Sequence, residues 1–486
     1  MKTNFMFSFA SSVAPCSTSL PFFQQKNHSK YPARRNMWIC LLLCILTALS
    51  SCSSDDDTDT PDNPPSTDTS SPSLPIENLE NLEWERVPLG AQALEKTAPV
   101  SRARSAITLK NGRIVAVGWG KKNEAWDGIV WVSDDQGLTW AGISHTQIKK
   151  SSAQAIEAIT LAGEDRLVAV GIELQKDSSD PAVWLSDDNG KSWHSVTDKK
   201  LRTPERDRML AVTQTGERLV AVGWSQTGIN RFAATSWLSD DNGENWERVL
   251  IPREEAGKNR QNAPTGEKIH QVTLVGDRLV AVGKKISSQG ETPAIWLSDN
   301  SGKSWRGVPH TSIEDATPGL IPYTVTTLAN GTLIAAGTKH PDPKHRDKAT
   351  PAIWISHNKG KTWQHPPTSE NAFTTPGRQG ILTLFPIGDN QLIAAGADFP
   401  ANDPLDTIFP KSNTWNDKKT TGIWASKDSG NTWTQHRKKQ SALTGRGLKQ
   451  VFTLTRSANY LIALGMETFA QTHHLAIWRA QLHPTK

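Results

Sequence analysis

A six-residue motif that recurs seven times constrains the fold of this chain more than any other feature of its sequence. The four strongest copies read Arg-Ile-Val-Ala-Val-Gly or Arg-Leu-Val-Ala-Val-Gly, and three weaker copies keep the final glycine. The glycines lie 53, 52, 60, 54, 59 and 69 residues apart. Repeats of this period are typical of architectures in which each repeat is one supersecondary unit that packs on its neighbours. The seven glycines are Gly118, Gly171, Gly223, Gly283, Gly337, Gly396 and Gly465.

Tryptophan marks the second half of each repeat. An apolar run with a tryptophan follows each glycine, and in six copies a second tryptophan comes nine residues later. Fixed spacing inside the pair and variable spacing outside it indicate a rigid hairpin joined by variable loops. The pairs are Trp131 and Trp140, Trp184 and Trp193, Trp237 and Trp246, Trp296 and Trp305, Trp354 and Trp363, and Trp424 and Trp433, with Trp478 alone in the last repeat.

The residues between the paired tryptophans predict a tight turn, which we call the Ser-to-Trp turn. Its pattern is Ser-x-Asp/Asn-x-Gly-x-x-Trp in all six copies. Asp or Asn caps backbone N–H groups, and glycine supplies a positive φ. The pattern resembles the Asp-box, or bacterial neuraminidase repeat, of the sialidase-like superfamily. The resemblance implies a β-propeller in which the turns are structural and lie away from any active site. The Asp/Asn positions are Asp135, Asp188, Asp241, Asn300, Asn358 and Asp428.

Each repeat reads as four strands, so we expect an all-β, seven-bladed β-propeller with four-stranded blades over residues 81–486. The seventh repeat lacks a Ser-to-Trp turn and stops after its third strand. Residues 84–87, Trp-Glu-Arg-Val, match the fourth strand at 246–249. The N-terminal strand is therefore predicted to complete the last blade and close the ring, which removes exposed sheet edges.

The N-terminus is predicted to be a lipoprotein signal. Residues 1–51 form an N-terminal extension and signal peptide, in which Arg34-Arg35 precedes an apolar segment at 37–49, too short to span a membrane. Leu-Ser-Ser before Cys52 resembles the bacterial lipobox, which implies lipid attachment at Cys52. Residues 52–80 are rich in Ser, Asp, Thr and Pro and are expected to be a disordered acidic tether. Ser53, rather than aspartate, directly after Cys52 resembles the sorting pattern that favours a bacterial outer-membrane location, periplasmic or surface-exposed.

Cysteine and charge exclude several classes of protein. The four cysteines, Cys16, Cys40, Cys44 and Cys52, lie near the N-terminus, so disulfide scaffolds, zinc ribbons and cysteine hydrolases are excluded beyond residue 52. The chain has net charge +5, from 54 basic and 49 acidic residues. Residues 1–51 hold five basic residues and no acid, and the tether holds eight acids and no Lys or Arg. The propeller thus has 54 − 5 = 49 basic and 49 − 8 = 41 acidic residues, a net +8.

Two sets of residues are candidates for ligand binding. Trp119, Trp224 and Trp415 fall outside the structural pairs and could stack on a ligand, although loop packing is the favoured alternative. Alignment on the inner strands places a second set near the central channel, where cations would favour carboxylate or phosphate ligands. Salt bridges between blades are the alternative role. This second set is Arg104, Arg208, Tyr323, Arg378 and Lys449.

The sequence favours a binding or assembly module for a glycan or protein partner. The alternative is a sialidase-like or other glycoside hydrolase acting on surface glycans. The Arg-Ile-Pro motif of sialidases is absent, and Tyr323 is the sole plausible nucleophile. Sialidase propellers also have six blades, whereas seven repeats are present here. We expect a monomer that binds no nucleic acid and no cofactor. No metal-ligand spacing is present beyond the single pair His473-His474.

The lipobox resemblance predicts that Cys52→Ser releases the protein from the membrane fraction. A serine hydroxyl cannot form the thioether that carries the lipid. Most of the variant protein should therefore be found in the soluble fraction after cell fractionation. Cys44→Ser, inside the apolar segment, is the matched control and should leave the protein in membranes. Continued membrane association of the Cys52 variant would contradict lipid attachment there.

Overall fold

The computed structural model describes the second of two compact units, Met1–Asp68 and Thr69–Lys486. The first unit, and with it Cys52, lies outside the described residues. The residues described are 76–90, 100–122, 125–143, 153–175, 178–252, 265–340, 349–366, 373, 379–398, 421–436, 442–443, 448–469 and 472–483.

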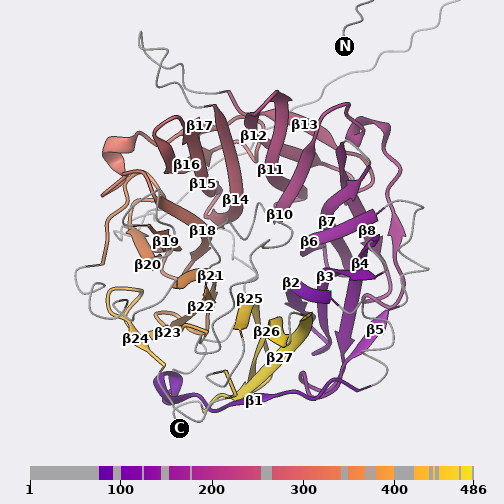
Figure 1. Cartoon of the computed structure of the whole chain (residues 1–486), viewed down its shortest axis with the longest axis vertical. Helices are drawn as coiled ribbons and strands as arrows, with labels where there is room; N and C mark the ends of the chain where they lie inside the picture. The colour runs from indigo at the N-terminus through magenta and orange to yellow at the C-terminus, as the bar shows by residue number, and fades with distance from the viewer. Residues whose placement is uncertain are drawn as a thin grey trace, which may run out of the picture. The chain divides into compact units, whose positions relative to one another are not determined.

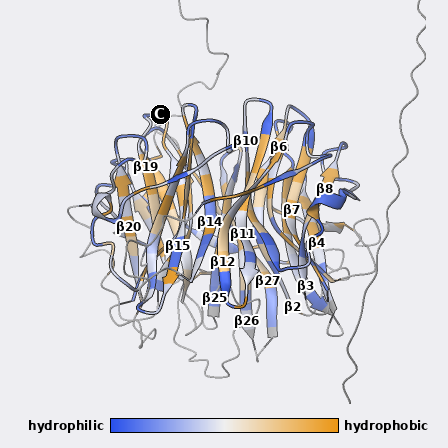
Figure 2. Ribbon diagram, turned by 90° about the horizontal axis from the view of Figure 1, so that it is seen from above, coloured by the Kyte–Doolittle hydropathy of each residue, from blue (hydrophilic) through white to orange (hydrophobic). Residues whose placement is uncertain are grey.

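The described residues form β-strands and short 3-10 turns and include no α-helix, which confirms the all-β prediction. The described strands form five sheets, two of eight strands, one of three and two of four. A single residue pair, Phe232 with Gly266 or Ala397 with Gln450, joins the two halves of each eight-stranded sheet. We therefore describe the strands as seven successive antiparallel groups (Figure 1). Apolar strand residues lie between hydrophilic turns (Figure 2). Group 1 holds β2 (Val100–Thr108), β3 (Ile114–Lys122), β4 (Ala125–Ser133) and β5 (Ala141–Ile143); group 2 holds β6 (Ala153–Ala162), β7 (Arg166–Leu174), β8 (Ser179–Ser186) and β9 (His194–Ser195); group 3 holds β10 (Asp207–Thr215), β11 (Arg218–Gly228), β12 (Arg231–Ser239) and β13 (Glu247–Leu250); group 4 holds β14 (Gly266–Val275), β15 (Arg278–Ser287), β16 (Gly290–Ser298) and β17 (Arg306–Gly307).

The remaining groups follow the same order. The 3-10 turns among the described residues are η1 (Leu79–Asn81), η3 (Lys199–Leu201) and η5 (His310–Ser312). Group 5 holds β18 (Leu320–Thr327), β19 (Leu333–Lys339) and β20 (Thr350–Ser356), extended by a bridge between Ile355 and Gln364; group 6 holds β21 (Gln379–Pro386), β22 (Leu392–Asp398), β23 (Ile423–Ser426) and β24 (Thr434–Gln435); group 7 holds β25 (Leu448–Ser457), β26 (Tyr460–Phe469), β27 (Thr472–Gln481) and β1 (Trp84–Arg86).

The first strand of each group contacts the first strand of the next, and the last contacts the first. This circle runs through β2, β6, β10, β14, β18, β21 and β25 and returns to β2. Between neighbouring groups, buried residues of one sheet pack on those of the next and form a series of apolar clusters rather than one central core. The centre of the circle is therefore left for a cavity.

The N-terminal segment at 76–87, here called the strap, completes group 7. β1 pairs antiparallel with β27, which confirms the predicted pairing of the N-terminal strand with the last repeat. The Gln391 side chain forms hydrogen bonds with both backbone groups of Ile76. The Ile76 N–H donates to Gln391 Oε1 at 2.7 Å, and Gln391 Nε2 donates to the Ile76 carbonyl at 3.0 Å. Ile76 and Leu79 are buried. The prediction that the tether extends to residue 80 is thus wrong by five residues, because these apolar side chains have a core to enter.

The Ser-to-Trp turns are closed by one repeated set of hydrogen bonds. In the first turn, Ser133 Oγ donates to Asp135 Oδ1 at 2.9 Å and accepts from the Gly137 N–H at 3.0 Å. The Thr139 N–H donates to Asp135 Oδ1 at 2.8 Å, and Trp140 Nε1 donates to the Gly137 carbonyl at 3.0 Å. The other five turns repeat this set. The carboxylate or amide thus replaces water for backbone groups that the turn leaves unpaired.

The arginine that opens each of the four strongest repeat motifs ties its group to the next. Arg113 donates from Nε and Nη2 to Asp134 in its own turn, at 2.6 and 2.7 Å, and from Nη1 to the Asn189 carbonyl in the next turn, at 3.2 Å. Arg166, Arg218 and Arg278 repeat the arrangement on Asn242, Ser301 and Lys359. These exposed pairs contribute little energy individually, but they fix the angle between neighbouring groups.

The glycine that ends each repeat motif allows an inner strand to bulge. In every group the register of the first two strands shifts by one residue opposite this glycine. The bulge directs an inner-strand carbonyl at the glycine, and a Cβ at any of the seven glycines would overlap that oxygen. The glycines are thus required for close approach of backbone rather than for a positive φ.

Gly283→Ala should therefore destabilise the protein by about 3 kcal/mol, the upper range for forcing atoms into a packed interior. Its Cβ would overlap the Lys268 carbonyl. Gly216→Ala is the control, because its Cβ meets nothing within 4 Å and its φ of +57° costs only about 1 kcal/mol. Urea unfolding of both variants measures the difference, and equal losses would contradict the close-approach explanation.

Candidate functional site

A cavity of about 200 Å³ lies at the centre of the circle of inner strands. Each of the seven groups contributes its bulged residue to the cavity wall. The bulge therefore does more than bend the strand, since it aims one side chain per group at a common space. The seven bulged residues are Arg104, Glu157, Leu210, His270, Tyr323, Leu382 and Phe452.

The two residues Arg104 and Glu157 of the cavity wall belong to one ionic cluster. Arg104 donates from Nε to Glu157 Oε2 at 2.7 Å, and Arg208 donates from Nη2 to Glu157 Oε1. The Glu157 side chain has no exposed area, and the two arginines are 8% and 5% exposed. Arg102 completes the cluster and is also buried. Three guanidinium groups and one carboxylate leave a net charge of +2 in a desolvated site.

The surroundings of this cluster shift the pKa values of Glu157 and Arg102. Burial raises the pKa of Glu157, but Arg208, Arg104 and Arg102 outweigh it and lower that pKa to about 2. Burial, followed by the charge of Arg104, lowers the pKa of Arg102 well below its ordinary value. Arg102 forms no ion pair among the described residues, and its Nε and the Nε of Arg208 are buried without hydrogen-bond partners there. These two Nε–H groups therefore lack an acceptor among the described residues.

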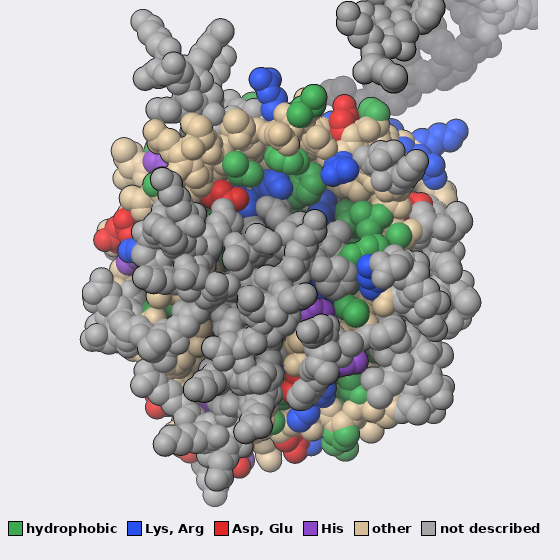
Figure 3. All heavy atoms as spheres, in the orientation of Figure 1, with side chains coloured by type: hydrophobic (Ala, Val, Ile, Leu, Met, Phe, Trp, Pro, Cys, Tyr) green, Lys and Arg blue, Asp and Glu red, His purple; other side chains and the backbone are tan. Residues whose placement is uncertain are grey.

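Aromatic rings hold the cations of this face in place. The Arg102 guanidinium lies 4.0 Å from the centre of the Trp119 ring and 5.0 Å from that of Phe452. Lys268 lies 4.4 Å from the centre of the Trp224 ring. Such stacking stabilises a cation without neutralising it. On the face in Figure 3, Lys and Arg side chains accordingly lie among hydrophobic ones.

The two tryptophans predicted to stack on a ligand are not open platforms. Trp119 is 1% exposed and Trp224 is 8% exposed, each beneath a cation. Inner-strand cations of their own or the next group cover the rings, which agrees with the packing alternative. Trp415 lies outside the described residues.

The structure separates the residues that were aligned as one cationic ring. Arg104 and Tyr323 occupy bulges and line the cavity. Arg208 stands two residues before its bulge, so its equivalent in group 1 is Arg102. Lys449 stands three residues before its bulge, donates to the Ala442 carbonyl at 2.7 Å and lies 3.6 Å from a Glu467 oxygen, which makes it part of another cluster. Arg378 lies outside the described residues.

Sequence reasoning missed Arg102 and did not place Glu157 beside the arginines. The alignment of the inner strands assumed that these strands are uninterrupted. Each inner strand instead contains one extra residue at its bulge, which shifts the residues that precede it. The repeat glycine was the available signal, because the residue that faces it across the strand pair precedes the bulge directly. Counting back from the glycine would have aligned Arg104 with Glu157.

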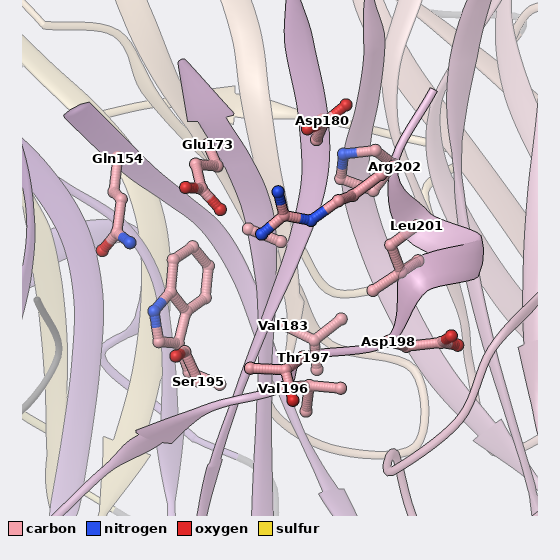
Figure 4. Close-up of a pocket in the computed structure, with 13 residues that line it drawn as sticks. Gln154, Glu173, Asp180, Val183, Ser195, Val196, Thr197, Asp198, Leu201 and Arg202 are labelled. Carbon is pink, nitrogen blue, oxygen red and sulfur yellow. The ribbon is translucent and has the colours of Figure 1, made fainter. Parts of the chain in front are cut away.

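A second pocket lies between β8 and the segment that follows β9 (Figure 4). Glu173, Asp180 and the Arg202 guanidinium lie toward one end, with Val183 and Val196 toward the other. Its volume of about 20 Å³ suits a single water. Asp180 already accepts from the Thr203 N–H at 3.1 Å and from Gln175 Nε2 at 2.6 Å. This pocket is therefore a structural gap at the outer edge of group 2.

Within the described part of the chain, no helix combines the length and apolar character needed to cross a membrane. The same residues contain no group of three His, Cys, Asp or Glu side chains placed to hold a metal ion.

No protein-family model matches the sequence, and no curated protein matches it. Among solved structures, YCF48 bound to a D1 peptide is 14% identical with a TM-score of 0.47, covering 85% of this chain and 99% of that chain. The GH74 xyloglucanase from Xanthomonas campestris is 15% identical with a TM-score of 0.48, covering 80% of this chain but 54% of the xyloglucanase, about half its length. The α-L-arabinanase from Penicillium chrysogenum in complex with arabinobiose is 13% identical with a TM-score of 0.43, covering 85% and 98%. These likenesses say nothing of activity.

The Glu157 pKa predicts how stability depends on pH. A carboxylate whose folded pKa is depressed stabilises the fold above its unfolded pKa and loses that contribution as pH falls. The shift from 4.5 to about 2 corresponds to about 3 kcal/mol. The difference in unfolding free energy between wild type and Glu157→Gln should therefore shrink between pH 5 and about 2. Urea unfolding across this range measures it, and a difference independent of pH would contradict the ionised buried carboxylate.

Proposed function

We propose that the chain is a seven-bladed Asp-box β-propeller with four-stranded blades, in which the seven strand groups are the blades. Seven antiparallel groups, a closed circle of inner strands and one set of turn hydrogen bonds repeated six times support this. Group 5 has only a single bridge in place of a regular fourth strand. The strap supplies the fourth strand of group 7.

The function that the geometry supports best is a binding module, held at a bacterial outer membrane by a lipid on Cys52. The module would act as a monomer and take a glycan or protein partner that carries acidic groups. The observation that carries the proposal is the cluster of Arg102, Arg104 and Arg208 around Glu157, in which Arg104 and Glu157 line the cavity. Arginine forks suit carboxylate and phosphate oxygens, and a desolvated site strengthens such contacts.

A glycoside hydrolase is the second candidate, because Tyr323 lines the same cavity as Arg104. Two observations favour binding over catalysis. Glu157 is the only carboxylate among the described residues that line the cavity, and both of its oxygens are held by arginines. With its pKa at about 2 it cannot serve as a general acid near neutral pH. A retaining or inverting pair of carboxylates is thus not assembled by these residues.

The binding proposal predicts that Arg102→Gln weakens binding of acidic glycans by about 10- to 100-fold, the worth of one or two charged hydrogen bonds. Arg102 is the variant of choice because Glu157 keeps both of its ion pairs. A glycan array of neutral and uronate- or sialate-containing oligosaccharides, followed by calorimetry on the strongest hits, measures the effect. Arg231→Gln, an exposed arginine at the β11–β12 hairpin, is the matched control.

Two results would contradict the proposal. Equal binding of neutral and acidic glycans by wild type and Arg102→Gln would remove the role of the arginine cluster. Turnover of fluorogenic sialosides that Tyr323→Phe abolishes would identify a hydrolase in place of a binding module.

A further inference from the structure

Glu157 occupies the arginine cluster as a ligand carboxylate would. Its two oxygens accept from two guanidinium groups that come from different strand groups, Arg104 on β2 and Arg208 on β10. Glu157 itself belongs to β6, which lies between them. The carboxylate is fully buried and cannot swing into water. The cluster is therefore held in an occupied geometry by the chain's own side chain.

Glu157 does not use up the cluster. It takes one N–H of Arg104 and one of Arg208, whereas each guanidinium carries five. Arg102 contributes a third guanidinium, oriented by Trp119 and Phe452 rather than by a carboxylate. The three guanidinium groups together carry a charge of +3, and the Glu157 carboxylate reduces the net charge of the cluster to +2.

The bulged residues of the other groups show that the fold does not need a carboxylate at this position. Five of the seven groups place Leu210, His270, Tyr323, Leu382 or Phe452 at the equivalent position. Among these seven positions, the carboxylate lies between the two groups whose arginines pair with it. Removing one partner of a buried ion pair is costly, but the pair itself contributes little net stability compared with apolar packing. The pairing is thus better explained by its effect on the arginines than by its effect on folding.

We propose that Glu157 is a built-in competitor that sets the affinity of the arginine cluster for an oxyanion ligand. The inference rests on the proposed binding function and deepens it. By holding two of the three arginines, Glu157 keeps the site ordered when it is empty. By lowering the local charge, it weakens the hold on a carboxylate or sulfate and keeps binding reversible.

The test compares Glu157→Gln with wild type for binding of two probes, sodium glucuronate and sodium sulfate, by calorimetry. An anion beside the cluster loses its repulsion from Glu157, so binding should tighten by about ten-fold or more for both probes. Glu467→Gln is the matched control, because Glu467 is a buried glutamate with a Lys and an Arg partner outside the cavity. Its affinity for the probes should equal that of wild type.

The possible outcomes separate this inference from the proposed function. If wild type binds the probes, Arg102→Gln loses them and Glu157→Gln binds no tighter, Glu157 is structural and the inference is overturned while the binding function stands. If wild type, Glu157→Gln and Glu467→Gln all bind neither probe, the binding function fails together with the inference. Preference for one probe in the tightened variant identifies the source of the oxyanion as a carboxylate or a sulfate.

A second measurement covers the case in which Glu157→Gln folds poorly. The melting temperature is followed as sulfate is added to wild type, Glu157→Gln and Glu467→Gln. Ligand binding stabilises the folded state in proportion to its affinity, so the slope should be steepest for Glu157→Gln. The Glu467 variant corrects for the general stabilising effect of sulfate. Equal slopes would overturn the inference.

Discussion

The close approach of an inner-strand carbonyl to the repeat glycine is the contact on which the rest of the structure depends. A side chain at that glycine would overlap the carbonyl oxygen in all seven groups. With glycine present the inner strand bulges, and the bulged residue turns toward the centre of the circle. The same residue that defines the repeat in the sequence therefore also builds the cavity wall. Without it, the inner strands would keep a regular register and present other side chains to the centre.

The periphery supplies the rigidity that a central cavity requires. Ser-to-Trp turns satisfy their own backbone groups, and four arginines carry the hydrogen-bonding pattern from one group to the next. Where the last group lacks a turn, the strap fills the place through Gln391 and the buried Ile76. A direct contact also joins the first and last groups, because Gly137 of group 1 packs against the Ile462 side chain of group 7. Packing between groups thus replaces a central core, and the centre is free for polar side chains.

Sequence reasoning predicted the repeated elements well and the site only in part. The repeat and the turn depend on local patterns and short-range spacing, which were readable. The pairing of the strap followed from the missing fourth strand of the last repeat. Alignment of the inner strands placed Arg104 and Tyr323 near the channel, and both line the cavity because they fall on bulges. Arg208 was aligned with the wrong partner, since a bulge shifts register without leaving a gap in the sequence. The burial of Trp119 under Arg102 could not be read, because it depends on a contact across two strands.

The arginine cluster is hard to explain as a purely structural feature. One arginine would neutralise Glu157. An apolar residue at this bulge would cost less free energy of desolvation, and Leu210, Leu382 and Phe452 occupy the equivalent bulges of other groups. The chain instead buries a second arginine against Glu157 and a third against Trp119 and Phe452. Burying three guanidinium groups beside one carboxylate lowers stability unless a further anion completes the set. The arginine cluster has an excess positive charge, and Glu157 and the aromatic rings already hold its guanidinium groups in place. This arrangement is the one expected of the proposed oxyanion-binding site.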